Sequence, residues 1–200
     1  MLDHVFLDAI GALRDAFEGA LLERQAVEER FQTDILLGDV TWETSYSLPG
    51  EGRPPRVTAE VTLDWPTWSQ TAYRSWCIGE TTDEHPEIEV EIVIRVQRLK
   101  PVPDAAAVMG VLPDTIPGFG DDDVHRSGPV VEQRFDREME PSDAAVEVSY
   151  DATYRLDEET LNDGSTLDGK FGALGGWVSS TLVRLGDLRL DFIPPLPDEG

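Results

Sequence analysis

Apolar and polar side chains alternate through residues 87–97, which read EIEVEIVIRVQ, with one exception at Val93. One side of this stretch carries only branched aliphatic residues: Ile88, Val90, Ile92, Ile94 and Val96. The other side is charged or polar: Glu87, Glu89, Glu91, Arg95 and Gln97. Successive side chains point to opposite faces of a β-strand, so the pattern predicts a half-buried strand, which is typical of antiparallel sheets. We expect the three glutamates to be solvated, screened by salt or paired with arginines of a neighbouring strand.

The same period of two recurs on both sides of this strand. Residues 40–48 and 57–65 alternate in the same way and flank the turn-rich segment PGEGRPP at 49–55, which predicts a hairpin. The remaining expected strands, two with clean alternation and two less regular, are residues 146–156, 187–192, 71–78 and 131–139. Together these runs predict a sheet-rich protein.

A helical period leads the chain. Within residues 2–29 the apolar side chains fall three and four positions apart: Leu2, Val5, Phe6, Ala9, Ile10, Leu13, Phe17, Ala20, Leu21 and Val27. Two shorter helices are expected at residues 104–112 and 175–185. The predicted fold class is α+β, with a long N-terminal amphipathic helix packed on a mainly antiparallel sheet of about six or seven strands and a long central loop. We expect one domain over 1–200: helix (1–30), strands (31–100), loop or arm (101–128), strands and one helix (129–193) and tail (194–200).

The composition is very acidic and poor in lysine. The 200 residues include 40 acidic and 16 basic ones, a formal net charge of −24, and lysine occurs only at Lys100 and Lys170. Such a charge opposes compaction at low ionic strength, whereas molar salt shortens the Debye length to about 3 Å and screens it. Because the acids alternate with core positions, the charge belongs to the folded surface. The composition indicates a halophile; an acidic protein with arginine-rich codon usage is the alternative.

Charge and cysteine content narrow the expected partners and compartment. The sequence shows no basic cluster, whereas duplex DNA and anionic membranes require a basic footprint, so neither is an expected partner. Cys77 is the only cysteine, which excludes an intrachain disulfide and suits a reducing compartment. Residues 1–22 lack the pattern of a signal peptide, and no apolar run nears the roughly 20 residues that span a bilayer. We expect a soluble, intracellular chain.

One segment could hold a cation. Residues 120–125 read GDDDVH and bring together Asp121, Asp122, Asp123 and His125. Carboxylates on a flexible loop can bind calcium or magnesium. A solvated acidic loop without a specific site is the favoured interpretation, so no metal or cofactor is expected.

Catalytic signatures are missing from the sequence. Residues 164–171, GSTLDGKF, approach a phosphate-binding P-loop but end in Phe171, where a hydroxyl is needed for magnesium, so a glycine-rich loop is favoured. The three histidines are isolated, and there is no GxSxG elbow, so no catalytic residue is assigned. An aromatic set could line a ligand pocket but is more readily explained as core: Trp42, Trp65, Trp68, Tyr73 and Trp76.

The predicted order of elements resembles that of two families. A leading helix, a hairpin, the strand at 87–99, a short helix after residues 101–103 and the strand at 144–156 are similar to the layout of tailed-virus tail-terminator and tail-completion proteins. That resemblance implies a small α+β subunit that forms rings at the head–tail junction. Residues 7–15, LDAIGALRD, followed by LGDVTWE at 37–43, resemble the helix and hairpin of trypsin-co-occurring domains of prokaryotic conflict systems. Neither resemblance supplies functional residues.

These observations predict a non-enzymatic structural or assembly protein of a halophile, in the role of an oligomeric tail or neck subunit of a tailed virus or virus-like particle. Its expected partners are other copies of itself, in a ring, and other particle proteins; its expected location is the cytoplasm during assembly and then the virion. The alternatives are a protein-interaction module like the co-occurring domains and a small-ligand-binding enzyme.

Overall fold

The computed structural model describes residues 4–24, 27–36, 38–80, 84–116, 124–162 and 165–195. Within these ranges the chain forms five helices and a seven-stranded sheet, so the predicted α+β class is confirmed. In chain order the elements are α1 (His4–Arg24), β1 (Val27–Leu36), β2 (Asp39–Ser47), β3 (Val57–Trp65), α2 (Thr67–Cys77), β4 (Glu87–Leu99), α3 (Ala105–Val111), β5 (His125–Arg126), β6 (Val130–Phe135), β7 (Pro141–Arg155), α4 (Glu158–Asn162) and α5 (Ser165–Gly186).

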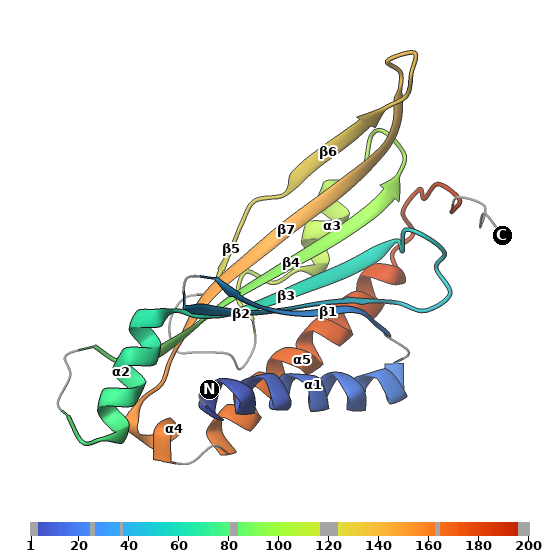
Figure 1. The fold of residues 1–200 in the computed structure, drawn as a ribbon. Coiled ribbons are helices and arrows are strands. Elements are labelled where there is room, and N and C mark those ends of the chain that lie inside the picture. The colour runs from blue at the N-terminus through green and yellow to red at the C-terminus, as the bar shows by residue number, and fades with distance from the viewer. Residues whose placement is uncertain are drawn as a thin grey trace.

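The sheet is antiparallel throughout its described pairings. Its order is β1-β2-β3-β4-β7-β5, and β6 pairs with β7 beside β5 (Figure 1). The predicted hairpin is present as β2 and β3, and the alternating stretch at 87–97 lies in the central strand β4. β7 continues from the body of the sheet into the hairpin that it forms with β6.

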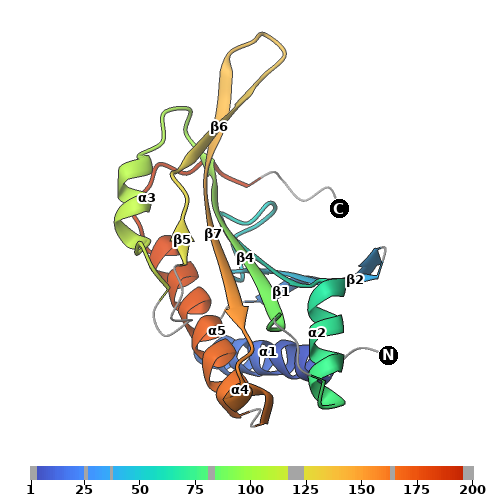
Figure 2. The ribbon, with the colours of Figure 1, turned by 90° about the vertical axis from the view of Figure 1, so that its left-hand side faces the viewer.

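One face of the sheet is covered by helices. α1 and α5 cross beneath it, and α3 lies on the same side (Figures 1 and 2). The alternating apolar side chains of β4 all point into this core and are at most 3% exposed. Aromatic contacts join the layers: Phe6 stacks on Trp65 with ring centroids 5.9 Å apart, and Tyr154 meets the edge of Phe171 at 5.4 Å. The hydrophobic effect of this one-sided burial holds the sheet to its helices.

The start of the chain differs from the prediction. The first helix ends at Arg24, and Val27 begins β1, an edge strand paired with β2, whereas the sequence predicted helix to residue 29. The predicted strand at 71–78 is also wrong, because this segment lies in α2. α2 buries Ser69, Gln70, Ala72 and Tyr73, which lie on one side of a helix.

The end of the chain also differs. α5 begins at Ser165, ten residues earlier than predicted, and so includes most of the glycine-rich segment that was predicted to be a loop. Leu167, Phe171 and Leu174 are fully buried, and their burial offsets the low helix propensity of the glycines between them. The predicted strand at 187–192 is reduced to a single bridge between Leu99 and Phe192.

The long loop predicted at 101–128 contains the expected short helix, which is α3, and the short strand β5. Asp104 caps α3 by accepting a hydrogen bond from the Ala107 N–H at 3.0 Å. Residues 117–123 of this loop lie outside the described residues. No helix in the described part of the chain is both long enough and apolar enough to cross a membrane.

Candidate functional site

The β6–β7 hairpin projects from the body of the protein as an arm, defined here as residues 130–143 (Figures 1 and 2). Every residue of β6 is exposed. Four large apolar side chains are exposed on this arm: Val130 (54%), Val131 (45%), Phe135 (52%) and Met139 (75%). Exposed apolar side chains that gather on one element mark a contact surface more often than scattered ones do.

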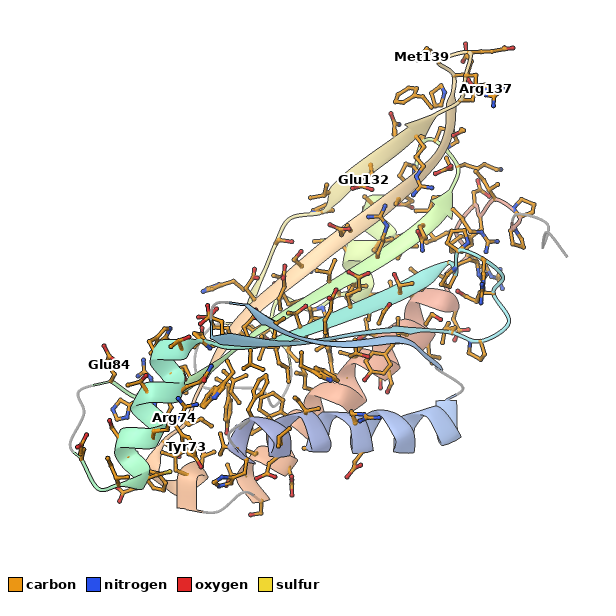
Figure 3. The ribbon with its side chains drawn as sticks, in the orientation of Figure 1. Tyr73, Arg74, Glu84, Glu132, Arg137 and Met139 are labelled. Carbon is orange, nitrogen blue, oxygen red and sulfur yellow. The ribbon has the colours of Figure 1, made fainter. Side chains whose placement is uncertain are left out.

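The tip of the arm is a turn closed by hydrogen bonds. The Asp136 carboxylate accepts hydrogen bonds from the backbone N–H groups of Glu138 (2.8 Å) and Glu140 (3.0 Å). Asp136 in turn donates its own N–H to the Glu140 carbonyl at 2.9 Å. Met139 has a φ of 63°, and its side chain points away from the body together with Arg137 (Figure 3). The turn therefore presents an apolar side chain on a fixed backbone.

The root of the arm is joined to the sheet by an arginine of β4. The Arg95 guanidinium donates to Glu147 of β7 at 2.7 Å and also to Glu132 of β6. The hydrogen bond from Arg95 lowers the pKa of the Glu132 carboxyl. One side chain thus connects three adjacent strands where the arm leaves the body.

A hollow at the same root is lined by three arginines. Arg95 and Arg98 come from β4 and Arg134 from β6. The carboxylates of Glu132 and Asp143 and part of the C-terminal segment also line the hollow. The sequence predicted no basic cluster, because these residues are separated by about forty positions. Arg134 is the most accessible of the three: its side chain is 64% exposed and its nearest carboxylate, Asp143, is 3.9 Å away.

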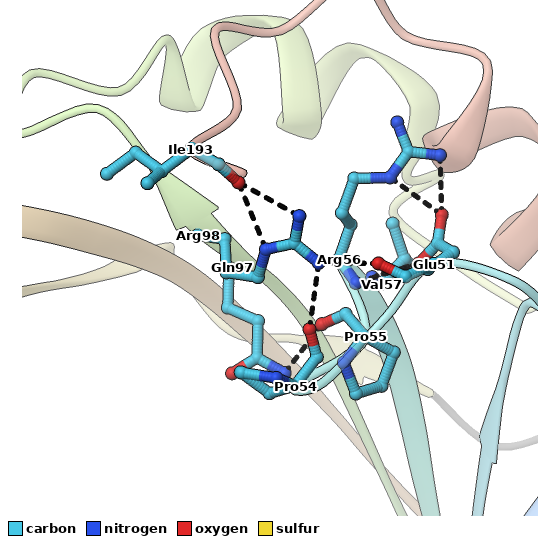
Figure 4. Close-up of polar contacts among 8 residues, drawn as sticks. All are labelled: Glu51, Pro54, Pro55, Arg56, Val57, Gln97, Arg98 and Ile193. Atoms are coloured by element: carbon cyan, nitrogen blue, oxygen red, sulfur yellow. Dashed lines mark hydrogen bonds and ion pairs between the residues drawn. The ribbon is translucent and has the colours of Figure 1, made fainter. Parts of the chain in front are cut away.

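Arg98 fastens the C-terminal segment to the β2–β3 loop (Figure 4). Its φ is 60°, at a bulge where the β4–β7 register shifts between Val96 and Leu99. The bulge re-aims its side chain. The guanidinium donates to the carbonyl oxygens of Ile193 (2.9 and 3.1 Å), Glu51 (2.6 Å) and Pro54 (3.0 Å).

Glu51 completes this network. Its side chain is only 3% exposed and accepts from the N–H groups of Arg56 (2.7 Å) and Val57 (3.2 Å) and from the Arg56 guanidinium (2.9 Å). The Arg56 guanidinium also lies 4.9 Å from the centre of the Phe192 ring. The loop and the C-terminal segment are therefore held by charge-assisted hydrogen bonds and one cation–π contact.

The open face of the sheet carries an acidic hollow, which is lined by Asp64, Glu89, Glu91, His125 and Asp151. Carboxylates are directly opposite one another here: Glu89 faces Asp64 across β3–β4, and Glu91 faces Asp151 across β4–β7. Burial, followed by repulsion from these neighbours, raises the pKa of both Glu89 and Glu91. Among the ion pairs of the described residues, Glu87 is the one of the three glutamates singled out in the sequence that has an arginine partner, Arg155, at 3.0 Å.

The Glu91→Gln variant is expected to be more stable than the wild type at pH 7 and low salt, by about 0.5 kcal/mol, because it removes one of two opposed charges. Protonation of Glu91 stabilises the fold, since its pKa is raised in the folded chain. That contribution is fully present below the ordinary carboxyl pKa and is lost as the pH rises through the raised pKa. The advantage of the variant should therefore disappear on acidification to about pH 4. Urea unfolding of the variant and the wild type at a series of pH values measures this difference in stability.

The control for this experiment is Glu138→Gln, the same chemical change at the exposed tip of the arm. Its free energy of unfolding should exceed that of the wild type by little at any pH. A Glu91→Gln advantage that does not change with pH would mean that the raised pKa has no part in it.

The segment considered as a candidate cation site in the sequence is only partly described. Asp121, Asp122 and Asp123 lie outside the described residues, while His125 is exposed at the start of β5 and borders the acidic hollow. Among the described residues no group of three or more histidine, cysteine, aspartate or glutamate side chains is arranged to hold a metal ion. The sequence did not group His125 with the carboxylates of β3, β4 and β7, because only the strand order brings them together.

The other sequence motifs belong to the scaffold. Of the P-loop-like segment, residues 165–171 are helical and Phe171 is fully buried. Trp42, Trp65 and Tyr73 are core residues, as favoured, whereas Trp68 is 41% exposed. Cys77 is exposed at the end of α2.

A fold of this class, a one-sided antiparallel sheet with a projecting hairpin, serves many functions and identifies none of them. Comparisons with protein-family models, with curated proteins and with solved structures find no match to this chain. The two resemblances in element order therefore stay predictions, and function has to be argued from the surfaces described above.

Proposed function

We propose that this protein is a non-enzymatic assembly protein that works at high salt and forms oligomers, in the role of a tail or neck subunit of a tailed virus or virus-like particle. The observation that carries the proposal is the arm: a projecting hairpin with exposed apolar side chains, whose strand β6 pairs only with β7 among the described residues. An exposed edge strand is a liability for a protein that acts alone, because it pairs readily with other chains.

The electrostatics support the same proposal. The net charge of −24 keeps the body soluble, and the side chains at the arm's root are paired across strands. Eight large apolar side chains are exposed in the described part of the chain. Four of them lie on the projecting hairpin, and the other four, Leu7, Trp68, Ile78 and Val102, lie elsewhere in the chain. This grouping of four on one element suits a protein that contacts its neighbours through that element.

Size-exclusion chromatography with light scattering, at about 2 M salt where the charge repulsion is screened, tests the proposal. The expected result is a mass that is a multiple of one chain and that rises with concentration. A chain that stays monomeric at every concentration, and that brings down no partner protein from its native source, would contradict it.

A further inference from the structure

The free edge of β6 has a sequence that complements itself. We propose that two copies of this chain pair through their β6 strands, antiparallel and centred on Gln133, to form a continuous sheet across a two-fold axis. This inference rests on the proposed assembly function and names the partner and the contact. Three steps lead to this pairing: which backbone groups are free, which registers they allow, and which register the side chains select.

The first step is the orientation of the β6 backbone. At the hairpin end the Asp136 N–H points to β7 and donates to Glu140. Backbone groups of alternate residues point to opposite sides of a strand, so Arg134, Glu132 and Val130 also direct theirs to β7. Val131, Gln133 and Phe135 therefore direct their N–H and C=O groups outward, where the exposed edge of β6 leaves them open to another strand.

The second step is the set of allowed registers. In an antiparallel pair, outward-directed residues must lie opposite outward-directed residues. A two-fold pairing is then centred on a residue, and moving the centre by one residue gives the next allowed register. The candidates near the middle of the strand are centres on Glu132, Gln133 and Arg134.

The third step is side-chain complementarity. With the centre on Gln133, Glu132 lies opposite Arg134 of the second copy, twice by symmetry, on the open face of the sheet. On the other face Val131 lies opposite Phe135 of the second copy, also twice. A centre on Glu132 instead places that carboxylate opposite itself, and a centre on Arg134 opposes two guanidinium groups. Opposite charges and apolar pairs across strands stabilise a sheet and like charges destabilise it, so the centre on Gln133 is selected.

The side chains concerned are accessible in the single chain. The side chain of Glu132 is 49% exposed, although it accepts a hydrogen bond from Arg95. The side chain of Arg134 is 64% exposed and lies 3.9 Å from the Asp143 carboxylate. Val131 and Phe135 are about half exposed, at 45% and 52%. Pairing would add about six backbone hydrogen bonds and bury both apolar pairs.

The test is a charge exchange within this register. Arg134→Glu should weaken dimerisation about 30-fold, because the new glutamate lies opposite Glu132 of the second copy, twice by symmetry. Glu132→Arg should do the same by opposing two arginines. Mixing the two variants should restore association as a heterodimer, since every cross-strand pair is again of opposite charge, and the double variant Glu132→Arg/Arg134→Glu should restore the homodimer. Sedimentation velocity at about 0.5 M salt suits the measurement, because repulsion between whole molecules is then largely screened.

A backbone variant gives an independent test. Gln133→Pro removes an outward N–H without removing a bond to β7 and should abolish pairing, whereas Gln133→Ala keeps that N–H and should pair as the wild type does. Far-ultraviolet circular dichroism and the unfolding midpoint verify that each variant is folded. If the wild type associates while all these variants associate equally well, the proposed contact is wrong and the assembly function stands. If the wild type never associates with itself or with any partner, the assembly function itself fails.

Discussion

Replacing Arg98 with alanine is expected to lower the free energy of unfolding by about 3 kcal/mol, because a hydrogen bond to a charged group contributes roughly 1.5–3 kcal/mol and the contributions are not additive. Arg98 serves three carbonyl oxygens, those of Glu51, Pro54 and Ile193. Without the guanidinium these partly buried acceptors lose their donor, and the C-terminal segment loses its hydrogen-bonded link to the β2–β3 loop. Urea unfolding followed by tryptophan fluorescence measures the loss.

Two controls sharpen this prediction. Arg98→Gly removes the same hydrogen bonds but should be about 1 kcal/mol less damaging than alanine, because glycine adopts a φ of 60° without steric cost. Arg137→Ala makes the alanine change at the exposed tip of the arm and should stay within about 0.5 kcal/mol of the wild type. An Arg98→Ala variant as stable as Arg137→Ala would show that the network contributes nothing to stability.

Lowering the salt from about 2 M to about 50 mM should reduce the free energy of unfolding by about 2 kcal/mol or more, because the Debye length grows from about 2 Å to more than 10 Å. The two directly opposed carboxylate pairs, Glu89 with Asp64 and Glu91 with Asp151, account for up to about 1 kcal/mol each. The rest of the −24 charge adds to the repulsion. Urea titrations at several sodium chloride concentrations measure the dependence.

The matched control is the double variant Glu89→Gln/Glu91→Gln, which removes one charge from each opposed pair. Its stability should depend less on salt than that of the wild type, while Glu138→Gln should leave the dependence nearly unchanged. Equal stability of the wild type at the two salt concentrations would contradict the interpretation of the composition as an adaptation to high salt.

Local periodicity was sufficient for the strands of the sheet centre but not for α2. The sequence predicts strands β2, β3, β4 and β7 well. Each of them has one buried face and one charged or polar face, and this leaves a period of two in the sequence. The residue that caps the start of α2 is distant in sequence: the Asp39 carboxylate accepts a hydrogen bond from the Thr67 N–H at 2.6 Å. That hydrogen bond lowers the pKa of Asp39. A cap supplied from 28 residues away leaves no local signal.

The candidate surface could be predicted only in part. The sequence predicted an irregular strand at residues 131–139, which overlaps β6, and the charged residues of β6 are visible in it. What the sequence does not reveal is that β6 is an edge strand, because that depends on β7 pairing with β4 on its other side. The arginine hollow and the acidic hollow were missed for the same reason, since each gathers side chains from strands that are distant along the chain.

The continuity of β7 has a mechanical consequence. The same strand forms one side of the arm and then runs beside β4 through the middle of the sheet, and Arg95 bridges it to both neighbours where the arm begins. A pull on the arm along its own length would load the β4–β7 ladder in shear, so that many backbone hydrogen bonds resist together. A pull across the sheet would instead unzip them one at a time. The hairpin should therefore resist a force along its axis better than a force across the sheet.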